Sequence, residues 1–90
     1  MSLYTLLFDY LGGTYVGQVR ASSPSFALTA WLDRLEVENV SGLTPSAKKK
    51  LTERSEQDHP VEVQTCENAW CWTTVLGEKL ALVNIVKTAE

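Results

Sequence analysis

The side chains that could support chemistry are few, and they lie in the second half of the chain. His59 stands in a polar stretch just before Pro60, and two cysteines, Cys66 and Cys71, follow it. A histidine within reach of a cysteine can act as its base and produce a nucleophilic thiolate. The spacing of these three residues matches no signature of a catalytic pair. A Cys/His-dependent enzyme therefore stays a second alternative, and we assign no catalytic residue.

A metal site would need the same three side chains and a fourth ligand, such as Glu62 or Glu67. A C-x4-C spacing with one upstream histidine is a weak signal beside the paired CxxC motifs of structural zinc sites. We expect no metal and no cofactor.

The cysteines could instead pair with each other. Strands over 61–66 and 70–76, joined by a short loop, would set Cys66 directly across from Cys71. No secretory signal is visible, because the start MSLYTLLFDYL has no positive stretch and carries Asp9 in its apolar run. We expect a cytoplasmic protein of bacterial type in which both thiols stay reduced.

Charge and hydropathy exclude two classes of partner. The net charge is −3, and the one basic cluster, Lys48-Lys49-Lys50, is followed at once by Glu53, Glu56 and Asp58. Nucleic-acid binding depends on clustered lysine and arginine, so no nucleic-acid partner is expected. No apolar run approaches the ~18 residues of a membrane span, so no membrane partner is expected either.

The elements that must position these side chains begin with a hairpin. Residues 4–10 and 14–21 alternate with period two, and Gly12-Gly13 can take the positive φ of a two-residue turn. With that pair at the turn, aromatic and apolar residues share one face, and Phe8 lies across from Gly17, which leaves room for its ring. This register pairs Tyr10 with Tyr15, Phe8 with Gly17, Leu6 with Val19 and Tyr4 with Ala21.

The hairpin also offers the weak candidates for a ligand site. Tyr10 and Tyr15 could stack on a small molecule, and Asp9 or Arg20 could supply a charge. Aromatic residues dominate small cores, so the same tyrosines are expected in the core wall. A small-ligand-binding domain that uses the first hairpin is the first alternative function.

A helix follows over residues 24–36. Ser22-Ser23-Pro24 supplies a serine N-cap and a proline at the first helical position. Its apolar side points toward the sheet, whereas Phe26 points nearly the opposite way. Phe26 either folds over a neighbouring loop or contacts a partner. The apolar side carries Leu28, Trp31, Leu32 and Leu35.

A polar segment, residues 43–60, separates the two halves of the chain. Thr44-Pro45 repeats the cap-and-proline signature, which predicts a short helix over 45–56. Ala47 and Leu51 are almost its whole apolar face, so we expect it to be exposed and largely solvated.

The last third is predicted to be β, with strands over 61–66, 70–76 and 79–86. Val61, Val63 and Trp72 are expected to face the helix, and Cys71 the opposite side. The predicted core is Tyr4, Leu6, Phe8, Val19, Leu28, Trp31, Leu32, Leu35, Val63, Trp72, Val83 and Ile85.

The final strand is apolar on both sides, interrupted only by Asn84. Such a strand is usually covered on both faces, and the chain has one convincing helix to cover one of them. Either the 45–56 segment or another chain covers the other. We expect an interaction surface there, or on the alternate face if Lys79 belongs to the turn. Its residues, with Phe26 on the helix, are Val75, Leu80, Leu82 and Val86, next to Cys71.

One stretch resembles a known family. The segment GGTYVGQVRASSPSFALTAWLDRL, a hairpin that leads into a serine-capped helix, is similar to the start of HicB-like antitoxins and other small bacterial domains. The similarity covers about a quarter of the chain and rests on a β-β-α pattern. The proline-glycine loop and a DNA-binding helix are absent here, so the resemblance implies no function and no specific family is identified.

Ninety residues form one domain with one core. The sequence predicts a single α+β domain over residues 1–90. A mainly antiparallel sheet of about five strands, in chain order ββα(α)βββ, carries one main helix on one face. The expected function is a non-enzymatic protein–protein interaction or self-associating module, with a protein partner or a homodimer.

Overall fold

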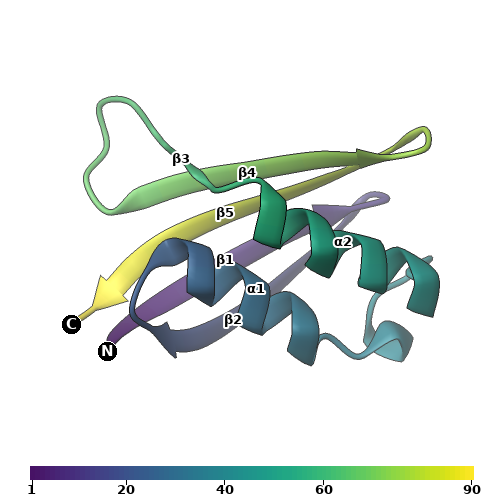
Figure 1. Cartoon of the computed structure of the whole chain (residues 1–90), viewed down its shortest axis with the longest axis horizontal. Helices are drawn as coiled ribbons and strands as arrows, with labels where there is room; N and C mark the ends of the chain where they lie inside the picture. Colours follow the sequence, from purple (N-terminus) through teal and green to yellow (C-terminus); the bar gives the residue numbers. More distant parts are fainter.

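The chain forms a two-layer α+β domain, as the sequence predicts. A computed structural model describes all residues, Met1–Glu90. A five-stranded antiparallel sheet has the order β2-β1-β5-β4-β3, so the first and last strands are neighbours at its centre (Figure 1). The elements are β1 (Ser2–Tyr10), β2 (Gly13–Ala21), α1 (Pro24–Arg34), a 3-10 turn (Val37–Asn39), α2 (Pro45–Gln57), β3 (Val61–Glu62), β4 (Ala69–Leu76) and β5 (Lys79–Ala89).

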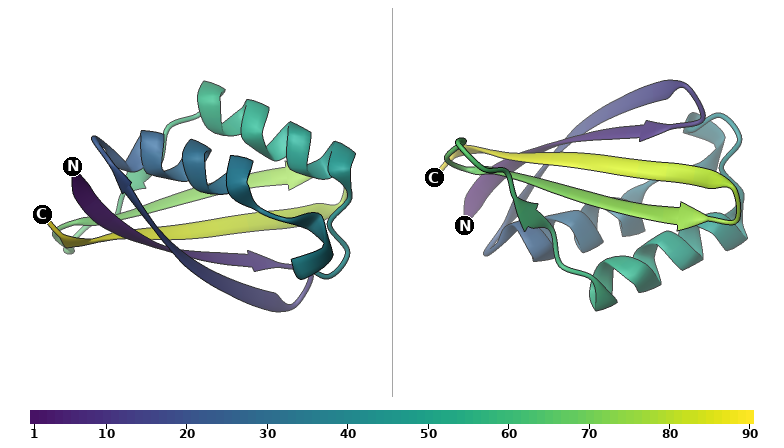
Figure 2. Two further views of the ribbon diagram at one scale, coloured as in Figure 1. Left: turned by 90° about the horizontal axis from the view of Figure 1, so that it is seen from below. Right: turned by 90° about the horizontal axis from the view of Figure 1, so that it is seen from above.

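Both helices lie on the same face of the sheet, and the opposite face is left open (Figure 2). Most residues of α2 are exposed, as expected, but the helix is packed into the domain through two buried residues that the expectation did not allow for. Leu51 is fully buried, and Ser55 is buried between the helices, where its hydroxyl lies 2.9 Å from Thr29 Oγ1. The indole Nε1–H of Trp72 on β4 donates to the main-chain oxygen of Asp58 at 3.0 Å. These contacts fix α2 beside α1 and over β4.

The helix starts follow from their capping residues. The Ser23 side chain accepts from the Phe26 N–H at 3.1 Å, and the Thr44 side chain accepts from the Ala47 N–H at 3.1 Å. Each cap is followed by proline at the first helical position, which has no N–H to leave unpaired. The first helix ends at Arg34, two residues before the predicted end.

The β1–β2 hairpin has the predicted faces but a register two residues away from the predicted one. Its turn is Leu11-Gly12, both with positive φ, and Tyr10 pairs with Gly13. A shift by two keeps every side chain on its face. Phe8 therefore pairs with Tyr15, and Gly17 lies under the indole of Trp31 and not under Phe8.

The predicted 61–66 strand is much shorter in the structure. The strand β3 holds only Val61 and Glu62, and positive φ values at Thr65 and Asn68 mark the loop that follows. Val61 pairs with Cys71, so it lies on the side away from the helices, which corrects the prediction for its face. The last hairpin turns at Gly77-Glu78, and β5 continues three residues past the predicted end.

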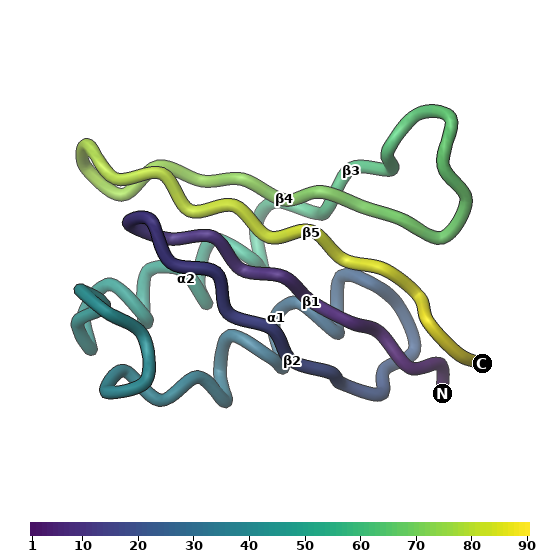
Figure 3. Tube along the Cα trace, turned by 180° about the vertical axis from the view of Figure 1, so that it is seen from behind, coloured from purple at the N-terminus to yellow at the C-terminus, as the bar shows by residue number.

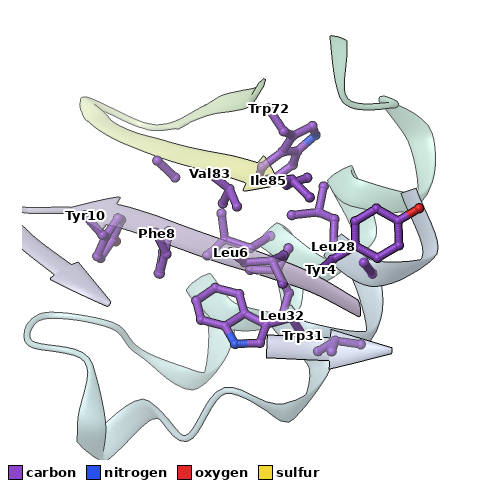
Figure 4. Close-up of a cluster of buried hydrophobic side chains, with 14 of the residues drawn as sticks. Tyr4, Leu6, Phe8, Tyr10, Leu28, Trp31, Leu32, Trp72, Val83 and Ile85 are labelled. Atoms are coloured by element: carbon purple, nitrogen blue, oxygen red, sulfur yellow. The ribbon is translucent and has the colours of Figure 1, made fainter. Parts of the chain in front are cut away.

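The core lies between the sheet and the helices (Figure 4). Ten of the twelve predicted core residues are buried, whereas Leu35 and Val63 are half-buried. Leu35 packs at the edge of the core, and Val63 falls in the loop after β3. The core also contains Tyr10, Ala21, Ala27, Val40, Leu43, Leu51 and Ala81.

The close approach of Trp31 to Gly17 gives a first prediction. A Cβ at Gly17 would overlap the Trp31 ring, which is itself packed edge-on against Phe8 with centroids 5.8 Å apart. Gly17→Ala is therefore expected to lower the free energy of unfolding by about 1–3 kcal/mol through overpacking. Urea unfolding followed by tryptophan fluorescence measures this change. Gln18→Ala, one residue along and exposed, is the control; equal losses in the two variants would contradict the prediction.

Candidate interaction surface

No helix covers the side of the sheet away from α1 and α2, and we call this side the open sheet face (Figure 3). Strand alternation places every second residue on it. Its members are Leu3, Thr5, Leu7, Asp9, Thr14, Val16, Gln18, Arg20, Val61, Ala69, Cys71, Thr73, Val75, Leu80, Leu82, Asn84, Val86 and Thr88.

Four apolar side chains and one asparagine form the middle row of this face. The pairings align one row across the whole sheet, from Val16 through Leu7, Asn84 and Cys71 to Val61. Val16 is 64% exposed and Val61 70% exposed. A monomer rarely leaves a continuous apolar patch of more than a few hundred Å² in water. The row is therefore the best candidate surface for a contact.

The apolar end of the face comes from the β4–β5 hairpin. Leu82 lies beside the middle row, and Leu80 pairs with Val75 next to the turn. Leu80 is 57% exposed and Val75 52% exposed. Together with Val86, these are the four strand residues predicted for the interaction surface, and the structure places all four on one face.

Phe26, the fifth predicted surface residue, lies elsewhere. It is 68% exposed on α1, in the helix layer and hence on the other side of the molecule. There it lines a shallow hollow with Ser25 and His59, whose Nδ1 lies 2.7 Å from Ser25 Oγ. Phe26 and the open sheet face therefore cannot contact the same flat partner at once.

Charge is almost absent from the open sheet face. The chain has eleven acidic and eight basic residues, and only Asp9 and Arg20 lie on this face. Asp9 accepts from Thr14 Oγ1 at 2.5 Å. Arg20 donates to the main-chain oxygens of Met1 and Glu90 at 3.3 and 3.4 Å. Asp9 thus has one neutral hydroxyl partner, and Arg20 binds two main-chain oxygens.

The chain's one ion pair lies at the end of β5, where Lys87 Nζ and Glu90 Oε1 are 2.8 Å apart. The hydrogen bond from Lys87 lowers the pKa of the Glu90 carboxyl, and the bond to Glu90 raises the pKa of Lys87. Both groups are exposed, so the pair contributes little to stability. It involves neither Asp9 nor Arg20.

The four weak ligand-site candidates do not come together. Tyr10 is buried in the core, and the hydroxyl of the half-buried Tyr15 accepts from the Ser41 N–H at 3.0 Å. Asp9 and Arg20 lie on the opposite face of the sheet. A site that combines the hairpin aromatics with either charge is therefore not present in this arrangement.

The residues with possible chemistry are also dispersed. Cys66 lies exposed in the loop after β3, and Cys71 is half-buried on the open sheet face opposite Val61. The prediction that Cys66 lies across from Cys71 is wrong, because β3 ends before it reaches Cys66. Both thiols are free. No group of three histidine, cysteine, aspartate or glutamate side chains converges where it could hold a metal ion.

The sequence does not show that one face of the sheet stays uncovered. Whether it does depends on the side of the sheet on which α2 packs. The signal for the surface was the two-sided apolar pattern of β5. Leu7 and Val16 are not among the predicted surface residues, and Val61 is predicted to face the helix, so the sequence analysis misses all three.

No helix is both long enough and apolar enough to cross a bilayer. Comparison of the chain with protein-family models, curated proteins and solved structures found no match.

Proposed function

We propose that the chain is a non-enzymatic protein–protein interaction module that associates with itself through the open sheet face. The observation that carries the proposal is the mainly apolar open sheet face, which no helix covers because both helices lie on the other side of the sheet. Covering such a row removes apolar area from water, which is the main driving force of association.

The composition of the face favours a protein partner over a nucleic acid. It offers one arginine and no lysine, whereas phosphate backbones are bound by clustered basic groups. The two free cysteines are consistent with the cytoplasmic location that we propose for the module.

Substitution of Leu82 tests the proposal. Leu82 lies on β5 between Asp9 and Thr73. Leu82→Lys is expected to weaken self-association at least about 100-fold, because a charge that replaces a leucine in the contact must be desolvated. Lysine is used instead of glutamate because Asp9 lies directly across, and a second negative charge there would destabilise the strand pair. Sedimentation velocity from about 1 μM to about 1 mM measures the dissociation constant.

Two further variants keep the test decisive. Val16→Lys changes a side chain that is 64% exposed, so it alters the same face with little change in monomer packing. Phe26→Lys is the matched control on the helix layer and is expected to associate like the unchanged protein. A strictly monomeric unchanged protein would overturn self-association. A dimer that persists in both Leu82→Lys and Val16→Lys would overturn this face as the contact.

A further inference from the structure

The two charged groups on the open sheet face define how two copies would pack, and this inference rests on the proposed function. We propose that the occupant of the face is a second copy of the chain, stacked sheet on sheet about a two-fold axis that runs across the strands. In this arrangement Asp9 of each copy pairs with Arg20 of the other.

The size of the face suits a second copy. Strands spaced about 4.8 Å apart, with a rise of about 3.3 Å per residue, give the four long strands a face of roughly 20 by 28 Å. Two such faces would bury on the order of 1,100 Å² in total if they overlapped completely, which is close to the roughly 1,000 Å² expected of a biological contact. Two sheets that stack in this way lie about 10 Å apart, with strands within about 30° of each other.

The two charges lie near opposite ends of the face. Asp9 pairs with Thr14 next to the first turn, and Arg20 pairs with Leu3 near the chain terminus. Leu3 and Asp9 are six residues apart on β1, or about 20 Å at the usual strand rise. Within one copy the two groups are therefore too far apart to pair.

The direction of the two-fold axis decides whether they pair between copies. An axis parallel to the strands leaves the position of each residue along the strand direction unchanged. Asp9 then meets residues of its own row, such as Leu82 and Thr73, and not Arg20. An axis across the strands reverses the order of the rows along the strand direction in the second copy. When this axis lies midway between the rows of Leu7 and Thr5, Arg20 of the second copy stacks over the row that contains Asp9. It is then displaced from Asp9 by one strand.

Pairing of Asp9 with Arg20 of the other copy also lowers the cost of covering the open sheet face. An aspartate enclosed in an apolar contact without a cation carries a large desolvation penalty. The neutral hydrogen bond from Thr14 does not offset that penalty. Arginine suits the role because its guanidinium can bind a carboxylate with two parallel hydrogen bonds. The symmetry forms two such pairs, one at each end of the contact.

Charge reversal tests the pairing without requiring a structure of the dimer. Asp9→Arg places two arginines together at both pairs, and Arg20→Asp places two aspartates together. Each variant alone is expected to associate about 10- to 100-fold more weakly than the unchanged protein. An equimolar mixture of the two restores both pairs, so it is expected to form a heterodimer of near-original affinity. Native mass spectrometry distinguishes this heterodimer from either homodimer by mass, and sedimentation velocity gives the dissociation constants.

The controls separate this pairing from general charge effects. Asp33→Arg changes the net charge as Asp9→Arg does, but on the exposed side of α1, and is expected to leave association unchanged. Asp9→Lys repeats the test with a different cation if Asp9→Arg fails to fold.

The failures of the two proposals are distinguishable. If both single variants dimerise like the unchanged protein, or the mixture does not recover, the pairing is overturned while the contact through the open sheet face stands. If the unchanged protein is a monomer over the whole concentration range, self-association and the pairing fail together, and a different occupant covers the face.

Discussion

Replacement of Phe8 with alanine is expected to lower the free energy of unfolding by about 3–5 kcal/mol. Phe8 is completely buried, and its ring lies 5.6 Å from that of Tyr10, 6.2 Å from Tyr15 and 5.8 Å from Trp31, between centroids. A domain of this size has a total stability of only about 5–13 kcal/mol, so the loss is a large share of it. Urea unfolding followed by tryptophan fluorescence measures the change.

The control for Phe8 is the other phenylalanine. Phe26 is 68% exposed, so Phe26→Ala is expected to change the free energy of unfolding by less than about 0.5 kcal/mol. Phe8→Leu keeps most of the buried volume and keeps the series measurable if the alanine variant does not fold. Similar losses for Phe8→Ala and Phe26→Ala would show that the aromatic cluster is not the centre of the core.

The second large effect is expected at Leu51, which the sequence placed on a solvated helix. Leu51 is fully buried, and with Ser55 it forms the buried side of α2. Leu51→Ala is expected to lower the free energy of unfolding by about 2–5 kcal/mol, because it leaves a cavity under the helix. Hydrogen exchange of the α2 amides, measured with urea unfolding, reports whether the helix loosens along with the domain.

Lys49→Ala is the control on the same helix. Lys49 is exposed, and alanine is a strong helix former, so stability is expected to change by less than about 0.5 kcal/mol. If Leu51→Ala were as mild as Lys49→Ala, α2 would be only loosely attached, and the packing of Leu51 would not be what stabilises it.

Period-two patterns predicted which face each hairpin residue occupies, but not which residues pair. The glycine pair at 12 and 13 suggested the turn, whereas the chain turns at Leu11-Gly12. Gly13 is needed elsewhere, because a Cβ there would lie 2.6 Å from the Tyr15 hydroxyl. The Tyr15 ring, two residues along the same strand, thus occupies the space beside Gly13, and period two alone does not reveal this contact.

The second helix was predicted in extent but not in packing. Its caps and length follow from Thr44-Pro45 and the helix formers after them, which are local signals. Its burial depends on Leu51, Ser55 and the hydrogen bond between Trp72 and Asp58, which join segments far apart in sequence. The same limit applies to the open sheet face. A strand that is apolar on both sides predicts a cover on both faces, whereas the arrangement of the whole fold decides whether the chain itself supplies that cover.

The central pairing of β1 with β5 has a consequence for how the domain is made. The inner edge of β1 can pair only after β5 has been made, because the β1–β2 and β4–β5 hairpins join only through the β1–β5 pair. During synthesis on the ribosome, the β1–β2 hairpin and both helices emerge while the inner edge of β1 is still unpaired. An unpaired strand edge is a template for pairing with another chain, so the nascent domain is most prone to aggregate in that interval. Contacts that span almost the whole chain also slow folding, because the long loop must close before they form.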